Sequence, residues 1–241
     1  MASRKAYPRI VGVGENAQVT SAPSPATVSW RRPHDLENLL PAALALAAAA
    51  VLQYLLPTTF HAIGPHWIIT AVEGVLLIVL VIVELLPQDV NLWRAASVLV
   101  SLVTLDNTAS SAVLVWRIAT GSAGRSATPL LAGGAGIWVT NVLVYGLWYW
   151  MIDRGGPYDR AAATTKAPDF AFPQMVSPDL ATQHWHPRLL DYLYVSFTSA
   201  TAFSPTDTMP MTLRAKALMT AQSVVALATV ALVLARAVNI L

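Results

Sequence analysis

The sequence has no cysteine among its 241 residues, and only 12% of its residues are charged. Without cysteine the chain forms no disulfide, no thiolate metal site and no cysteine nucleophile. Soluble domains carry about 25% charged residues, whereas here 55% of the residues are hydrophobic and the mean hydropathy is +0.54. These values predict an integral protein of the cell membrane that crosses the lipid bilayer several times.

A strong excess of charge of one sign is also missing, because the formal net charge is only +2. The basic residues are scattered between apolar runs, so we predict no nucleic-acid partner. The basic start of the chain is not followed by the apolar core of a signal peptide, and residues 1–36 are predicted to be a flexible basic tail. No paired nucleophile and base is visible, which predicts that the protein is not an enzyme and uses no cofactor.

Long apolar runs, by contrast, are abundant. A spanning helix needs about 20 apolar residues. Five runs meet this requirement, at residues 38–56, 67–86, 93–118, 129–152 and 213–241. We therefore predict an all-α integral membrane fold with five transmembrane helices. The first three helices form a predicted membrane region over residues 37–120.

The segment between the fourth and fifth runs is different in character. Residues 153–188 are polar and rich in proline. The stretch 187–203 that follows has an apolar middle too short to span a bilayer, which is typical of a re-entrant or interfacial helix. His184 and His186 stand in this polar part, but a His-x-His pair without a third ligand is weak evidence for metal, and we predict no metal site.

The end of the chain resembles the pore of tetrameric potassium channels. The stretch "DYLYVSFTSAT" is similar to the pore helix, "AFSPTD" occupies the filter position, and "LRAKALMTAQSVVALATVALVLARAVNI" is similar to the inner helix. The resemblance implies that residues 128–241 comprise an outer helix, a polar loop, a pore-type helix and an inner helix. It also implies a homotetramer and a pore lined by Thr201, Ala202, Phe203, Ser204, Pro205, Thr206, Asp207 and Thr208.

The filter position departs from the family at Ser204, Pro205 and Thr206, which replace Gly-Tyr-Gly. A potassium filter stacks backbone carbonyls, and proline is locked near φ −65° and has no N–H. In a tetramer, however, Asp207 would form a ring of acids that attracts cations. We therefore predict a cation-conducting channel without a standard potassium filter. The same residues also fit a capped helix start, with Ser204 as N-cap and Asp207 in the first turn.

Polar residues within the runs support an alternative function. Charged residues inside spans are costly and are functional candidates. The polar candidates within the runs are the acids Glu73 and Asp106 and the amides Asn107 and Asn141. Asp106 is either hydrogen-bonded for structural reasons or a proton or cation site. Around it, hydroxyl residues follow one face of the third run, which favours helix–helix hydrogen bonds. The alternatives are thus a small proton-coupled transporter using Asp106 and Glu73, or a non-conducting accessory module.

The sequence is compatible with more than one orientation of the chain in the membrane. Lys and Arg are concentrated in the tail and in residues 153–188, so the positive-inside rule places both on the cytoplasmic side. Five spans then put the pore-type segment on that side too, whereas potassium channels have it outside. Either the pore is inverted, or the N-terminus is outside, or the protein is not a channel.

Overall fold

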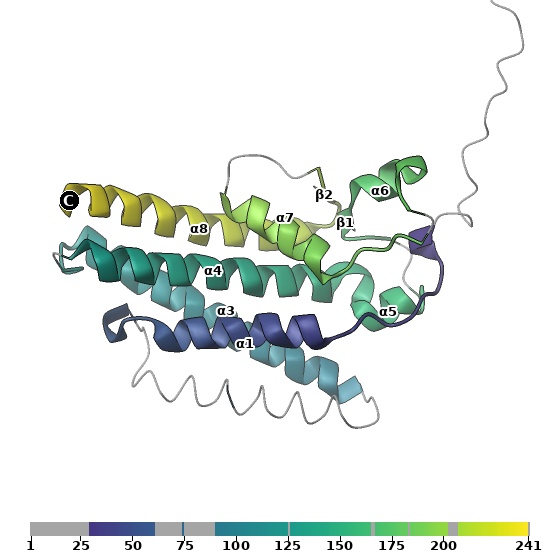
Figure 1. Cartoon of the computed structure of the whole chain (residues 1–241), viewed down its shortest axis with the longest axis horizontal. Coiled ribbons are helices and arrows are strands. Elements are labelled where there is room, and N and C mark those ends of the chain that lie inside the picture. Colours follow the sequence, from purple (N-terminus) through teal and green to yellow (C-terminus); the bar gives the residue numbers. More distant parts are fainter. Residues whose placement is uncertain are drawn as a thin grey trace, which may run out of the picture.

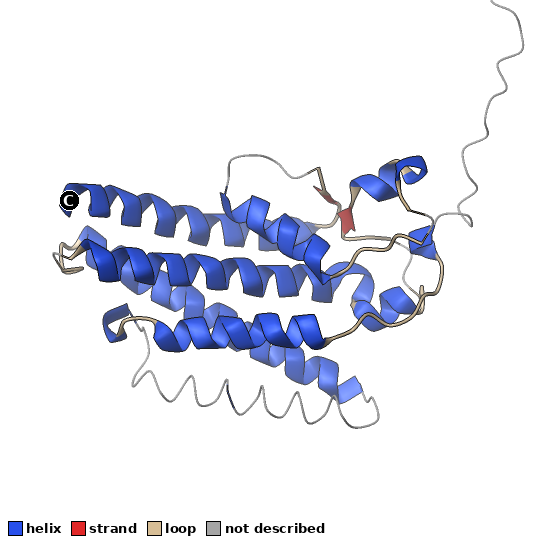
Figure 2. Ribbon diagram, viewed as in Figure 1, coloured by secondary structure: helices blue, strands red, loops and turns tan. Residues whose placement is uncertain are grey.

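The computed structural model describes residues 29–60, 74, 90–124, 126–164, 167–182, 184–201 and 207–240. This part of the chain is mostly helical (Figures 1 and 2). Its four longest helices are α1 (Leu40–Leu55), α3 (Val90–Ala119), α4 (Ala127–Ile152) and α8 (Leu213–Ile240). Of these, α3, α4 and α8 are long and apolar enough to cross a membrane. The protein is therefore a membrane protein by the length and composition of its helices.

The predicted spans correspond to these helices in part. The third, fourth and fifth apolar runs form α3, α4 and α8, as predicted. The first run forms α1, which has 16 residues and so measures about 24 Å, less than the roughly 30 Å of a bilayer core. The second run, with Glu73, lies outside the described residues except for Gly74, which is helical. The count of five spans stays a prediction.

The helix α4 is the centre of the bundle, because α1, α3, α7 (Leu189–Thr201) and α8 all pack against it. Its buried residues are apolar apart from a few such as Thr140 and Asn141, which is typical of a helix enclosed by others. Three of its glycines provide close approach: a Cβ at Gly133 would lie 2.8 Å from Phe60, one at Gly134 would lie 2.9 Å from Val233, and one at Gly146 would lie 2.6 Å from Leu193.

The helix α7 lies against α4 and α8 and extends along only part of them (Figure 1). It begins at the end of the bundle where α4 ends. Its 13 residues measure about 20 Å in length, whereas the 26 residues of α4 measure about 39 Å. The chain is back at the starting end by strand β2 (Met209–Pro210). From there α8 runs to the opposite end, with Thr212 Oγ1 accepting the Ala215 N–H at 3.3 Å as its cap.

Short elements cover the end of the bundle that contains the start of α7. They are η4 (Asp153–Gly155), α5 (Pro157–Ala161), β1 (Phe170–Ala171), α6 (Pro173–Val176) and η5 (Pro178–Leu180). Strand β1 pairs antiparallel with β2, so a two-stranded ribbon accompanies the helices (Figure 2). This ribbon ties the segment after α4 to the segment before α8.

The N-terminal segment is packed onto the same end from the first described residue. The 3-10 helix η2 (Ser29–Arg31) buries Trp30, whose carbonyl accepts a hydrogen bond from Arg154 Nη1 at 2.7 Å. The His34 N–H donates to the Ala161 carbonyl at 3.0 Å. The packed part of the chain thus includes residues within the range predicted as tail.

Candidate functional site

A buried hydrogen-bond network holds α7 between α4 and α8. Tyr149 Oη of α4 donates to Gln222 Oε1 of α8. Gln222 Nε2 donates to the carbonyl and to Oγ of Ser196 on α7, at 2.9 and 2.7 Å. Ser196 Oγ in turn donates to the Val142 carbonyl of α4 at 2.7 Å. Because these groups are shielded from water, their hydrogen bonds fix the depth of α7 in the bundle.

A salt bridge holds the start of α8 against the segment just before β1. Asp169, just before β1, accepts hydrogen bonds from Arg214 through both carboxylate oxygens, each at 2.6 Å. Thr212 Oγ1 donates to the same carboxylate at 2.6 Å, and the Met211 N–H donates to the Asp169 carbonyl at 2.7 Å. The bidentate geometry fixes direction as well as distance, so the start of α8 is held against β1.

A second acid, Asp153, joins the end of α4 to β1 and α7. Its Oδ1 accepts the N–H groups of Asp169 and Phe170, at 2.7 and 3.3 Å. Its Oδ2 accepts the hydroxyl of Tyr192 on α7 at 2.6 Å and lies 3.4 Å from Nε of Arg154. The carboxylate is fully buried. It therefore determines how the polar segment after α4 and the start of α7 meet at this end of the bundle, which we call the charged base.

Two buried arginines complete this base. Arg154 is 2% exposed and has φ 51°, in the left-handed region, and its guanidinium lies 5.4 Å from the ring centroid of Trp30. Arg160, also 2% exposed, donates from Nη1 to the carbonyls of Trp150 and Asp153. The base is thus an interlocked set of charges, which is an arrangement that depends on every partner being present.

The Asp169 carboxyl has a pKa below its ordinary value of 3.8. Burial raises this pKa, but hydrogen bonds from Arg214, Thr212 and the Arg154 N–H outweigh the burial. A depressed pKa in the folded state stabilises the fold above pH 3.8, and this stability is lost as the pH falls through the folded-state pKa.

Acidification below pH 4 is therefore expected to lower the melting temperature of the purified protein through Asp169. Thermal unfolding in detergent between pH 3 and 6 measures the effect. In Asp169→Asn the titrating group is absent, so its melting temperature should be lower at pH 6 and should depend less on pH. Asp179→Asn, a change at an exposed acid, is the control and should retain the pH dependence of the original protein. An unchanged profile in Asp169→Asn would contradict the assignment.

The residues predicted to line a pore are placed in part. Thr201 is the last residue of α7. Asp207 is exposed and lies in a bend, and Thr208 next to it is buried. Because α8 begins at Leu213, Asp207 is not in the first turn of that helix. The remaining predicted pore residues lie outside the described part of the chain: Ala202, Phe203, Ser204, Pro205 and Thr206.

The intramembrane candidates that the structure describes are all buried. Asp106 is 6% exposed, Asn107 is 1% exposed and Asn141 is fully buried. The predicted hydroxyl face of α3 does make helix–helix hydrogen bonds, because Thr104 Oγ1 accepts the Trp148 indole N–H at 3.0 Å and Ser111 Oγ lies 2.6 Å from Thr229 Oγ1. Other hydroxyls of that face bond to carbonyls of α3 itself.

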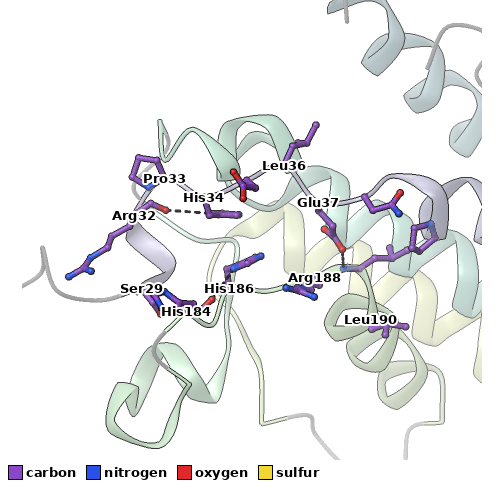
Figure 3. A pocket seen from close by; sticks show the side chains of 14 residues that line it. Ser29, Arg32, Pro33, His34, Leu36, Glu37, His184, His186, Arg188 and Leu190 are labelled. Atoms are coloured by element: carbon purple, nitrogen blue, oxygen red, sulfur yellow. Dashed lines mark hydrogen bonds between the residues drawn. The ribbon is translucent and has the colours of Figure 1, made fainter. Parts of the chain in front are cut away.

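A pocket of about 790 Å³ opens between the N-terminal segment and the start of α7 (Figure 3). In it the rings of His34 and His186 stack with centroids 4.0 Å apart. Burial lowers the pKa of His34, with a smaller contribution from nearby positive groups. Glu37 joins the pocket to α7, since its Oε1 accepts the Leu189 N–H at 2.8 Å.

Among the described residues, no group of three or more acids and histidines is placed to hold a metal ion.

Comparison of the chain with known proteins adds no relative. No family model, no curated protein and no solved structure matches it. The resemblance of its last residues to potassium-channel pores therefore stays a prediction from the sequence.

Proposed function

We propose that the protein is a pore-loop ion channel that favours cations and assembles as a homotetramer. One observation carries the proposal. The helix α7 enters the bundle from the end where α4 finishes, lies between α4 and α8, and the chain returns to the same end before α8 begins. In a membrane this path is a re-entrant hairpin between two spanning helices, which is the arrangement of a pore unit.

The physical setting of α7 is consistent with this role. The helix α7 ends at Thr201, partway along α4 and α8 (Figure 1). The carboxyl end of a helix carries partial negative charge, which favours a cation. Asp207, exposed near the mouth of the hairpin, adds a full negative charge.

The outer faces of α7 and α8 are available to further copies of the chain. Tyr194 and Phe197 on α7 are 60% and 48% exposed, and Leu227 on α8 is 59% exposed. Beside them, a groove between α7 and α8 is lined partly by the hydroxyl residues Ser199, Thr220 and Ser223. Polar side chains are rarely left facing lipid. We therefore place neighbouring subunits, rather than lipid alone, against this surface.

Ion flux through liposomes tests the channel directly. Purified protein reconstituted at low ionic strength is expected to pass monovalent cations, and Asp207→Asn is expected to lower the flux several-fold because it removes charge at the pore mouth. Asp179→Asn, a neutralisation at another exposed acid of the same end, is the matched control. Absence of flux, or equal flux in the two variants, would contradict the proposal.

A second candidate function rests on Asp106, which is buried within the spanning helix α3. We propose it as the proton-carrying group of a small proton-coupled transporter, the alternative to the channel. Uptake driven by a pH gradient would then be lost in Asp106→Asn and unchanged in Asp207→Asn. The two variants together separate the transporter from the channel, and a protein that does neither is an accessory module.

A further inference from the structure

Five polar side chains are buried in the interior of the bundle. They are separate from the hydrogen-bond network around α7 and from the buried charges of Asp153, Arg154 and Arg160. The five side chains come from three helices: Gln53 from α1, Asn107 and Ser110 from α3, and Thr140 and Asn141 from α4. Each is at most 1% exposed. We call this set the polar layer.

The packing of α1 on α4 places two of these residues at the same depth. The helices run antiparallel (Figure 1), and a Cβ at Gly136 would lie 3.1 Å from Cδ2 of Leu56. One turn further along α4 is Thr140, and about one turn back along α1 is Gln53. Since residues four apart share a helix face, Gln53 and Thr140 lie opposite each other.

The packing of α3 on α4 places the remaining residues of the layer at the same depth as Gln53 and Thr140. The Trp148 indole donates to Thr104 across this interface. Asn107 is one turn after Thr104, and Asn141 is two turns before Trp148, so both lie on the interacting faces and in the same direction from that bond. Thr140 and Asn141 are adjacent, which joins the two pairs into one layer near the middle of α4.

Seven side-chain polar atoms of this layer have no hydrogen-bond partner among the residues that the structure describes. They are Oε1 and Nε2 of Gln53, Oδ1 and Nδ2 of Asn141, Oδ1 of Asn107, Oγ of Ser110 and Oγ1 of Thr140. Buried polar groups in folded proteins are nearly always paired, because an unpaired group loses its hydration without compensation. A layer with this many unpaired atoms indicates a bound partner.

We propose that the polar layer binds a cluster of ordered water molecules at mid-depth in the membrane. The set contains both donors and acceptors, and water satisfies both kinds, whereas a metal cation satisfies only the oxygens. Buried waters occur about once per 27 residues and bond to such orphaned groups. The site is separate from α7 and does not depend on the proposed pore.

Radiolytic hydroxyl-radical labelling with mass spectrometry tests the proposal, because radicals formed from bound water label the buried side chains beside it. Val103 and Ile137, each fully buried and one turn from the layer, are expected to be labelled in the intact protein. Leu99, also buried but two turns from Asn107, is expected to remain unlabelled. If Val103 and Ile137 are as unreactive as Leu99, the layer is dry and the proposal is overturned.

Substitution adds a second readout. Asn141→Leu is expected to lower the melting temperature by roughly 2–4 °C, because it removes one partner of the water and leaves the others unpaired. Asn239→Leu, the same change at an exposed position of α8, should have little effect. A higher melting temperature in Asn141→Leu would overturn the proposal. So would a melting temperature raised by sodium or potassium chloride but not by choline chloride, since the ligand would then be a cation.

Discussion

Asp153→Ala is expected to leave little folded protein. The carboxylate is fully buried and accepts hydrogen bonds from Tyr192 and from two backbone N–H groups. Its loss removes these acceptors and leaves the guanidinium of Arg154 without its partner acid. Breaking a buried charge pair in this way costs about 3–5 kcal/mol, a large part of the 5–15 kcal/mol that stabilises a typical protein.

The measurement is the yield of monodisperse protein in detergent, followed by thermal unfolding of what is recovered. Asp159→Ala is the matched control, because Asp159 lies six residues away and its side chain is exposed. Asp153→Asn retains an acceptor oxygen at the same place and should be intermediate. If Asp153→Ala behaves as Asp159→Ala does, Asp153 does not hold the base of the hairpin together.

The long helices could be predicted from the sequence because a bilayer imposes a length that is visible in the residues themselves. The third, fourth and fifth apolar runs match α3, α4 and α8 within a few residues. The stretch that forms α7 was set apart by being apolar yet short. Its position between α4 and α8 follows from packing, which the length of a run does not specify.

The charged base could not be predicted, because its partners are far apart in the sequence. Asp169 and Arg214 are separated by 45 positions, and Asp153 and Tyr192 by 39. No periodicity relates such residues, and each acid alone looks like an ordinary loop residue. Gln222 left a weak signal, since it is a polar residue in the middle of an apolar run, but its partners Tyr149 and Ser196 emerge only from the three-dimensional packing.

The hydroxyl face of α3 shows which hydrogen bonds the spacing of residues in the sequence can predict. The spacing correctly predicted helix–helix hydrogen bonds, and two residues of this face make them: Thr104 with Trp148 and Ser111 with Thr229. Ser101 and Thr108 bond to carbonyls of their own helix instead. A hydroxyl can always satisfy itself on the preceding turn, so the sequence defines the face and the neighbouring helix decides which residues bond across it.

Gly146→Leu is expected to displace α7 from α4. A Cβ at this position would lie 2.6 Å from Cδ2 of Leu193 and 3.1 Å from its Cα, so α7 would have to move as backbone and not only as a side chain. Overpacking a close interface costs about 1–3 kcal/mol, and the shift would also break the bond from Ser196 to the Val142 carbonyl. We therefore expect a loss of thermal stability and, in the proposed channel, a loss of ion flux.

The control is Gly136→Leu on the same helix, where a Cβ would meet only the end of the Leu56 side chain, at 3.1 Å. Both variants exchange glycine for leucine within α4, so both gain helix propensity equally, and any difference reports the interface with α7. Melting temperature and liposome flux should fall much further for Gly146→Leu. If Gly146→Leu loses stability but its folded fraction passes ions normally, α7 supports the bundle without lining a pore. If the two variants are equally stable, α7 is not packed tightly against Gly146.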